Sequence, residues 1–106
     1  MFADMHVVIG GITHKIVKET DLYLYWCCRE RAWPKHTETN RLARQYAYAS
    51  MHTIHAICSV HGLDSGEMIA IVKSAFRHHM VYSAIYHYLW SYINRQYIEQ
   101  LMKEEA

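Results

Sequence analysis

The sequence predicts a mainly α-helical protein: three helices, an N-terminal β-hairpin, and a long third helix that is bent or broken. Three observations support this prediction. Helix-capping and helix-ending residues divide the chain near residue 34 and at residues 62–64, the first 17 residues are rich in β-branched side chains around a Gly-Gly pair, and no proline or glycine occurs between residues 67 and 103. With 106 residues, 52% of them hydrophobic, the chain can bury one core, and residues 1–106 are interpreted as a single domain.

The N-terminal segment, residues 5–17, reads MHVVIGGITHKIV, with Gly10 and Gly11 between two β-branched runs. A Gly-Gly pair in this setting is typical of a hairpin. A helix containing two destabilising glycines is the alternative. Thr20 is then predicted to cap the first helix, which runs to about Trp33 and is ended by the proline that follows.

The second helix is predicted to begin at Thr37 or Thr39 and to end near His61. Gly62 suits the left-handed position after a helix, where it would let the next residue, Leu63, fold back on the helix.

The third helix is predicted to begin with Asp64 as its N-cap and Glu67 as the reciprocal residue of a capping box. A straight helix from there to Lys103 would be about 57 Å long at 1.5 Å per residue. A compact domain of this size has a radius of gyration of only about 13 Å. The helix is therefore expected to break between His78 and Ser83, or to project and need a partner.

Charge and cysteine content exclude several classes of protein. Eleven Lys and Arg against ten Asp and Glu give a net charge of +1, which creates no overall field toward nucleic acid or lipid. Three cysteines, two of them adjacent, do not form the paired framework of a small secreted domain. The start lacks the features of a signal peptide, and the most apolar run, residues 80–93, is too short to span a bilayer. A cytoplasmic location without membrane contact is predicted.

No catalytic motif is present: the sequence has no G-x-S-x-G, P-loop, G-x-G-x-x-G or H-E-x-x-H. The ten acids lie at predicted helix ends, in the linker or near the C-terminus, where acids stabilise helices and keep chain ends soluble. The chain is therefore predicted to be no enzyme and to carry no cofactor.

A histidine-ligated metalloprotein is one alternative. His52 and His55 lie three residues apart, and an antiparallel third helix would bring His79 toward them, as a zinc site requires. However, no acid occurs between Glu38 and Asp64 to orient such ligands. The two histidines also belong to a polar stripe that is typical of a solvated or partner-facing edge. This stripe comprises Arg41, Gln45, Tyr48, His52, His55 and Ser59.

Nucleic-acid binding is the other alternative. The HGLDSGE turn imitates a helix-turn-helix, but its second helix begins with acidic and apolar residues that cannot read bases. A site mixing cations and rings on Arg41, Arg44, Tyr48 and His52 would suit non-specific binding. The near-zero net charge weighs against this function.

The stretch HHMVYSAIYHYLWSYI, residues 78–93, combines aromatic residues and histidines without any acid. Interface cores are depleted in charge and enriched in aromatic residues and methionine. The chain is therefore predicted to be a small protein-interaction module, a regulator or inhibitor of a macromolecular partner of the phage or mobile-element type, and to form a homodimer. The predicted partner-binding residues are Tyr82, Tyr86, Tyr88, Trp90, Tyr92, Arg41, Tyr48 and His52.

Overall fold

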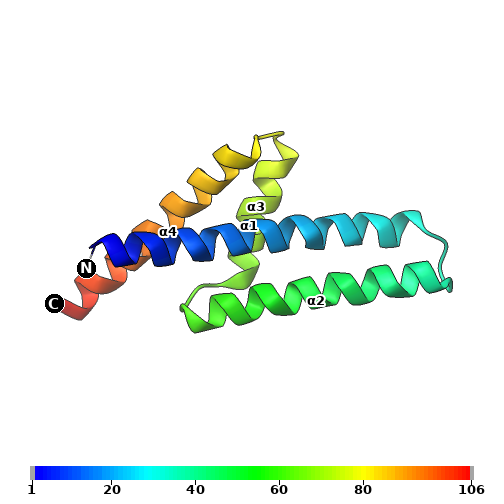
Figure 1. Ribbon diagram of the computed structural model, residues 1–106, viewed down its shortest axis with the longest axis horizontal. Helices are drawn as coiled ribbons and strands as arrows, with labels where there is room; N and C mark the ends of the chain where they lie inside the picture. The colour runs from blue at the N-terminus through cyan, green and yellow to red at the C-terminus, as the bar shows by residue number, and fades with distance from the viewer. Residues whose placement is uncertain (1, 106) are drawn as a thin grey trace.

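The computed structural model describes residues 2–105, with side chains from residue 5 onward, and this part of the chain is helical and contains no strand. The helices are α1 (Phe2–Ala32), α2 (Glu38–Val60), α3 (Ser65–Arg77) and α4 (Tyr82–Glu105) (Figure 1). The mainly α-helical prediction is confirmed. The N-terminal hairpin prediction is wrong, and the predicted bent or broken third helix is two helices, α3 and α4.

Residues 5–17 form the first half of α1 rather than two strands. Ile9, Ile12 and Ile16 recur at helical spacing and are buried on one side of α1, so helical periodicity decides the structure. Gly10 contributes to packing instead of a turn: the Tyr86 hydroxyl donates a hydrogen bond to its carbonyl oxygen at 3.3 Å. A methyl group at Gly10 would lie only 3.0 Å from that hydroxyl.

The prediction that Thr20 is an N-cap is also wrong. Thr20 lies in the middle of α1 and is fully buried, and no cap is needed there because the helix is continuous from Phe2.

The ends of α2 follow the local signals in the sequence. The Thr37 hydroxyl caps the helix by accepting a hydrogen bond from the Asn40 amide at 3.2 Å. At the other end Gly62 adopts a left-handed φ of 66°, and the Leu63 amide donates to the carbonyl of Cys58 at 2.8 Å. These predictions are confirmed.

The predicted third helix breaks where expected, between α3 and α4. Its N-cap is also confirmed, because Asp64 accepts a hydrogen bond from the Glu67 amide at 3.0 Å. At the break His79 adopts a left-handed φ of 57°, and the Met80 amide donates to the carbonyl of Ala75 at 3.1 Å. This is the geometry found at Gly62, with histidine in the place of glycine.

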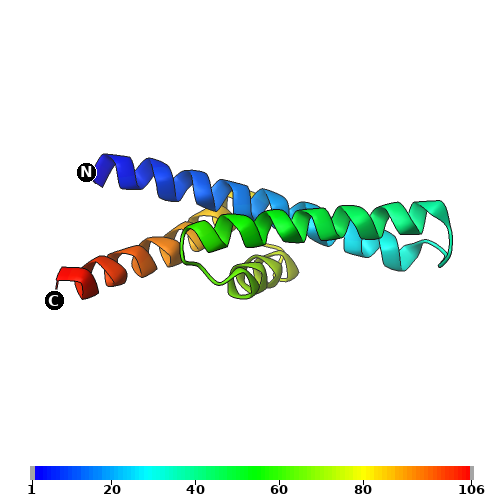
Figure 2. The same ribbon diagram turned by 90° about the horizontal axis from the view of Figure 1, so that it is seen from below.

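The four helices form two layers. α1 and α2 make an antiparallel hairpin, and α3 and α4 lie against one side of it (Figures 1 and 2). The core lies between the layers, where the largest fully buried side chains are Ile9, Ile16, Ile54, Met68, Ile85, Leu89 and Ile93.

The hairpin is longer than the layer that supports it. Its closed end, residues 22–48, extends past α3 and is called the arm (Figure 1). The molecule measures 55 × 27 × 19 Å and has a radius of gyration of 15.8 Å. A compact chain of this length would have a radius of gyration of about 13 Å. The arm therefore places a large surface outside the common core.

Candidate interaction surface

The interior of the arm is made of small side chains. On α2 the residues buried in the arm are Asn40, Ala43 and Ala47, none of them large. The Asn40 amide group donates to the carbonyl of Glu30 at 2.8 Å and so fastens the start of α2 to the end of α1. The large residues of α2 in the arm, Leu42, Tyr46 and Tyr48, are exposed instead.

Three rings in contact with one another, Tyr25, Trp26 and Tyr46, lie along the surface of the arm and are called the aromatic ridge. Trp26 stacks on Tyr46 with ring centres 4.8 Å apart, and Tyr25 meets Trp26 edge-on at 5.0 Å. Tyr25 is 47% exposed and Tyr46 51% exposed. The ridge joins α1 to α2 and holds its rings in place before any partner arrives.

Arg29 extends the ridge toward the tip of the arm. Its guanidinium lies over the ring of Tyr25 at 5.2 Å and over that of Trp33 at 5.8 Å. Cation–π contacts of this kind fix the charge in place on an exposed surface.

The arm carries a net positive charge. Residues 22–48 contain five Lys and Arg but two acids, a net charge of +3, which leaves −2 for the rest of a chain whose total is +1. Of the described side chains, one ion pair forms, between Arg41 and Glu38, and it lowers the pKa of the Glu38 carboxyl below its ordinary value. None of the other cations of the arm forms an ion pair with a described side chain.

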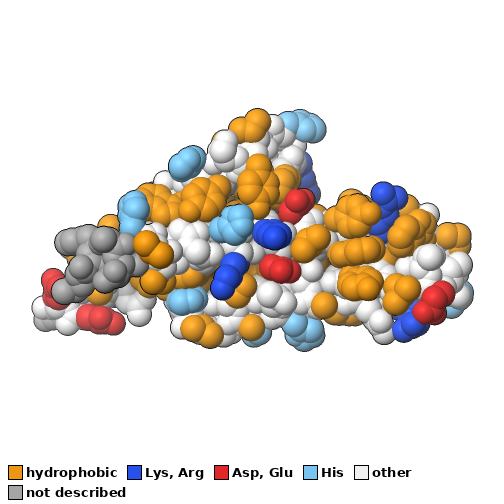
Figure 3. All heavy atoms as spheres, in the orientation of Figure 1, with side chains coloured by type: hydrophobic (Ala, Val, Ile, Leu, Met, Phe, Trp, Pro, Cys, Tyr) orange, Lys and Arg blue, Asp and Glu red, His pale blue; other side chains and the backbone are white. Residues whose placement is uncertain are grey.

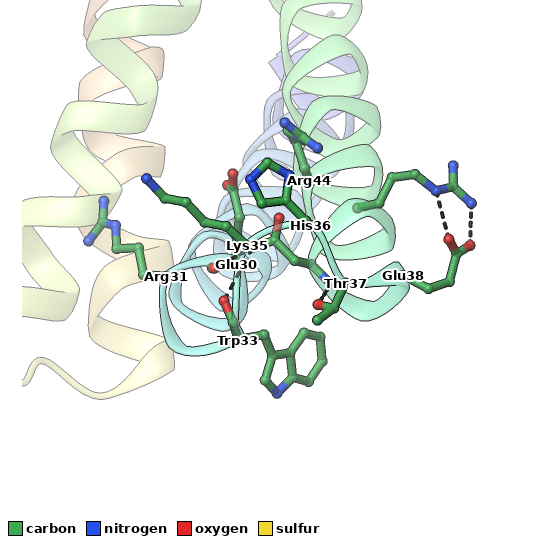
Figure 4. A pocket seen from close by; sticks show the side chains of 10 residues that line it. Glu30, Arg31, Trp33, Lys35, His36, Thr37, Glu38 and Arg44 are labelled. Carbon is green, nitrogen blue, oxygen red and sulfur yellow. Dashed lines mark hydrogen bonds and ion pairs between the residues drawn. The ribbon is translucent and has the colours of Figure 1, made fainter.

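An open pocket of about 680 Å³ lies at the tip of the arm, where α1 turns into α2 (Figure 4). Lys35, His36 and Arg44 lie around the Glu30 carboxylate on one side, and the Glu38–Arg41 pair lies on the other. His36 has a left-handed φ of 70°, which lets the linker reverse direction within a few residues.

The predicted polar stripe of α2, from Arg41 to Ser59, is exposed along its whole length and is called the outer stripe. It brings Arg41, Tyr48 and His52 to one side of the helix, and Tyr48 is 61% exposed. Arg44 and Tyr48 also line a hollow of about 190 Å³ at the side of the arm.

The five predicted residues of α4 do not share one surface. Tyr86 and Trp90 are half-buried against α1, where Trp90 meets the ring of His6 edge-on at 4.8 Å. Tyr92 donates a hydrogen bond to the Glu67 carboxylate of α3, which raises the pKa of the Tyr92 hydroxyl. Tyr82 and Tyr88 remain exposed, at 42% and 58%.

Within the described residues, no three His, Cys, Asp or Glu side chains are placed to hold a metal ion, so His52, His55 and His79 are not brought together. His55 instead shares a hydrogen bond with the Ser65 hydroxyl at 3.3 Å. The three cysteines are free, and burial together with Asp64 raises the pKa of the Cys58 thiol to about 11. That thiol is therefore a poor nucleophile at neutral pH.

None of the helices in residues 2–105 combines the length and the apolar character needed to cross a bilayer. Comparison with known proteins adds no relative: no family model, no curated protein and no solved structure matches the chain.

Sequence reasoning missed the aromatic ridge. Its residues stand in segments predicted to be helical, and no surface role was predicted for them. A usable signal was present in α2, because large residues at positions 42, 46 and 48 alternate with the small residues Ala43 and Ala47 that lie inside.

Proposed function

We propose that the chain is a small, non-enzymatic protein-interaction module of the cytoplasm that regulates or inhibits a partner protein by binding it with the arm. One observation carries this proposal: on α2 the arm buries small residues and exposes large ones, and the exposed side chains of the arm include Tyr25, Tyr46, Tyr48 and Arg29. Tyr and Arg are among the residue types that dominate the binding energy of protein interfaces. Rings and a guanidinium already held in place lose little entropy on binding.

The outer stripe and the tip of the arm are the part of this surface proposed to contact the regulated partner. There Tyr48 and Arg44 flank a hollow that is also lined by Glu30, and the arm as a whole carries a net charge of +3. Such a surface suits a protein that offers carboxylates around an apolar anchor, since charge complementarity speeds association and selects partners.

The experiment is capture of proteins from the native host, identification of the retained protein, and titration of that purified protein with variants. Tyr48→Ala combined with Arg44→Ala should weaken binding at least about tenfold. The matched control is Tyr88→Ala with Arg95→Ala, another exposed tyrosine and arginine pair, on α4. If the α4 double variant loses binding and the arm double variant does not, the binding site lies on α4 and the proposal that the arm binds the partner is wrong.

Nucleic-acid binding is a second candidate, favoured by the net charge of +3 on the arm and by the exposed Arg41, Arg44, Tyr48 and His52. It is weaker for two reasons. Arg41 is paired with Glu38, and the faces of Trp26 and Tyr46 are stacked on each other rather than free for bases. Affinity for a single-stranded oligonucleotide that falls steeply with salt and is lost in Arg41→Ala with Arg44→Ala would establish it instead.

A further inference from the structure

The side of the α1–α2 hairpin that faces away from α3 and α4 is uncovered along its length (Figures 2 and 3). We propose that a second copy of this chain covers it, packed antiparallel in a two-fold symmetric dimer. This inference rests on the proposed function, because it names a protein partner for the aromatic ridge. The surface concerned is called the hairpin face.

The hairpin face has the spacing of a helix-packing seam. Its residues follow one another at alternating intervals of three and four, the pattern with which helices pack along other helices. All of them are exposed: Val8, Gly11, Lys15, Lys18, Leu22, Tyr25 and Arg29 of α1, and Leu42, Tyr46, Ala49, Thr53, Ala56 and Val60 of α2.

The accessible surface of the chain is larger than that of a compact monomer of the same mass. The chain exposes 7357 Å². A compact monomer of 12.6 kDa would expose about 6,200 Å², so the excess is about 1,150 Å². A stable protein interface buries about 800 Å² on each partner. The excess is therefore large enough to supply one side of a dimer interface.

The two ends of the hairpin face have complementary shapes. One end carries the aromatic ridge. The other is an apolar groove of about 450 Å³ between α1 and α2, with Val8 and Val60 at its rims. Gly11 and Ala56 give the groove its depth, and a side chain added at Gly11 would meet nothing within 4 Å. Lys15 is the one Lys, Arg, Asp or Glu among the residues that line it.

The ridge and the groove lie at equal distances from the centre of the face. Tyr25 and Gly11 are each seven residues from Lys18, and on α2 Tyr46 and Val60 are each seven residues from Thr53. Seven helical residues span about 10.5 Å. A two-fold axis near Lys18 and Thr53 therefore places the ridge of each copy on the groove of the other, and the contact closes after two copies.

Charge at the centre of the face is compatible with this symmetry. Lys15 and Asp21 each lie three residues from Lys18, so a two-fold axis there sets Lys15 of one copy near Asp21 of the other, while the two Lys18 side chains meet near the axis. Figure 3 shows basic and acidic side chains between the hydrophobic groups of the arm and of the opposite end. The outer stripe is not part of the hairpin face and stays free for a different protein.

The test is sedimentation of the protein over a range of concentrations, with circular dichroism as a check of folding. We expect a species of twice the 12.6 kDa chain mass with a dissociation constant in the micromolar range. Gly11→Trp fills the groove from a position with open space, so it should weaken the dimer at least tenfold, about 1.4 kcal/mol, and leave the monomer folded. The matched control is Ala70→Trp, an exposed position on α3 in the other layer, which should remain dimeric.

A second variant makes the test specific. Tyr25→Ala with Tyr46→Ala trims the ridge and should also give monomers. When it is mixed with the Gly11→Trp protein, a heterodimer should form. The native ridge of the Gly11→Trp copy then meets the native groove of the other copy, and the second contact pairs the ridge without its tyrosine rings with the filled groove.

A wild-type chain that stays monomeric at about 100 μM, or a dimer that survives both the filled groove and the trimmed ridge, would overturn the proposal. Loss of partner binding in the Tyr48→Ala, Arg44→Ala protein is measured separately, on a surface outside the hairpin face. A monomeric wild type whose partner binding depends on Tyr48 and Arg44 would therefore remove the dimer and leave the proposed function standing.

Discussion

At the scale of single residues, the two buried threonines of α1 have opposite hydrogen-bonding environments. The Thr13 hydroxyl donates to the carbonyl oxygen of Ile9 at 2.6 Å, one turn earlier in the helix. The Thr20 hydroxyl is buried and has no hydrogen-bond partner in the described part of the chain. A buried polar group without a partner costs the free energy of its desolvation.

Thr20→Val should therefore raise the free energy of unfolding, by about 1 kcal/mol, since it removes the hydroxyl and keeps the branched shape. Urea denaturation measures the change. The control is Thr13→Val, which removes a bonded hydroxyl and should leave stability unchanged or lower it by about 1 kcal/mol. A loss of stability in Thr20→Val would show that the Thr20 hydroxyl makes a stabilising hydrogen bond.

Cys58 gives the protein a specific alkaline sensitivity. Its thiol is fully buried, and burial with the charge of Asp64 raises its pKa from 9.0 to about 11. Between these values the folded state keeps a proton that the unfolded state has lost, so stability must fall as pH rises. The stabilisation is complete below about pH 9 and is lost toward about pH 11, a change of about 2–3 kcal/mol.

The measurement is the unfolding free energy of the wild type and of Cys58→Ala at about pH 8 and about pH 11. The wild type should lose about 2–3 kcal/mol more than the variant over this range, because the tyrosines that also ionise are common to both proteins. An equal loss in both proteins would show that Cys58 does not titrate as described.

At the scale of elements, Gly10 and Gly11 are adjacent in α1 but have different surroundings. A methyl group at Gly11 would enter open space, whereas one at Gly10 would lie 3.0 Å from the Tyr86 hydroxyl. Alanine in a helix interior is favoured over glycine by about 1 kcal/mol. Only at Gly11 can this preference act without disturbing a neighbour.

Gly11→Ala should raise the free energy of unfolding by about 1 kcal/mol, and Gly10→Ala should raise it less or lower it, because Tyr86 must move. Denaturation at low micromolar concentration, where self-association contributes least, compares the pair. A larger gain at Gly10 than at Gly11 would show that Tyr86 does not pack against α1 as described.

The sequence made the helix ends predictable wherever one residue determines the geometry. Thr37, Gly62 and Asp64 each act on amides or carbonyls within a few residues, so their roles could be deduced without knowing the fold. The break at His79 has no such glycine, and it was predictable only because an unbroken helix would be too long for the domain.

Residues 5–17 were mispredicted because two local signals, β-branched side chains and a Gly-Gly pair, favoured strands. The helical spacing of Ile9, Ile12 and Ile16 was present in the same segment and reflects the packing that decided the outcome. The role of Gly10 depends on Tyr86, which lies 76 residues away in the chain, and no local pattern could reveal that contact.

The sequence made the type of candidate surface predictable, an aromatic-rich helical surface, but not its position in the fold. Aromatic residues at helical spacing occur both in α4 and in the arm. Which of them remain exposed depends on where α3 and α4 pack, and this covers Tyr86 and Trp90 while it leaves Tyr25 and Tyr46 outside. Such long-range packing is absent from a single sequence.

At the scale of the whole molecule, burial is uneven along the hairpin. In the half covered by α3 and α4, the interior contains large side chains such as Ile9, Ile16 and Ile54. In the arm the interior residues of α2 are Asn40, Ala43 and Ala47. Small side chains bury little apolar surface, so the arm should open more readily than the rest of the hairpin.

Hydrogen exchange followed by mass spectrometry tests this gradient. At low micromolar concentration, amides in residues 24–30 and 40–47 should exchange at least about tenfold faster than those in residues 9–16 and 52–58, since opening the arm exposes less apolar surface. Raising the concentration should slow exchange in the arm selectively if a second copy covers the hairpin face, because binding stabilises the closed form by mass action. Uniform protection along the hairpin at low concentration would mean that contacts within one chain hold the arm closed. The exposed rings of the arm would then have no part in stabilising it through a partner.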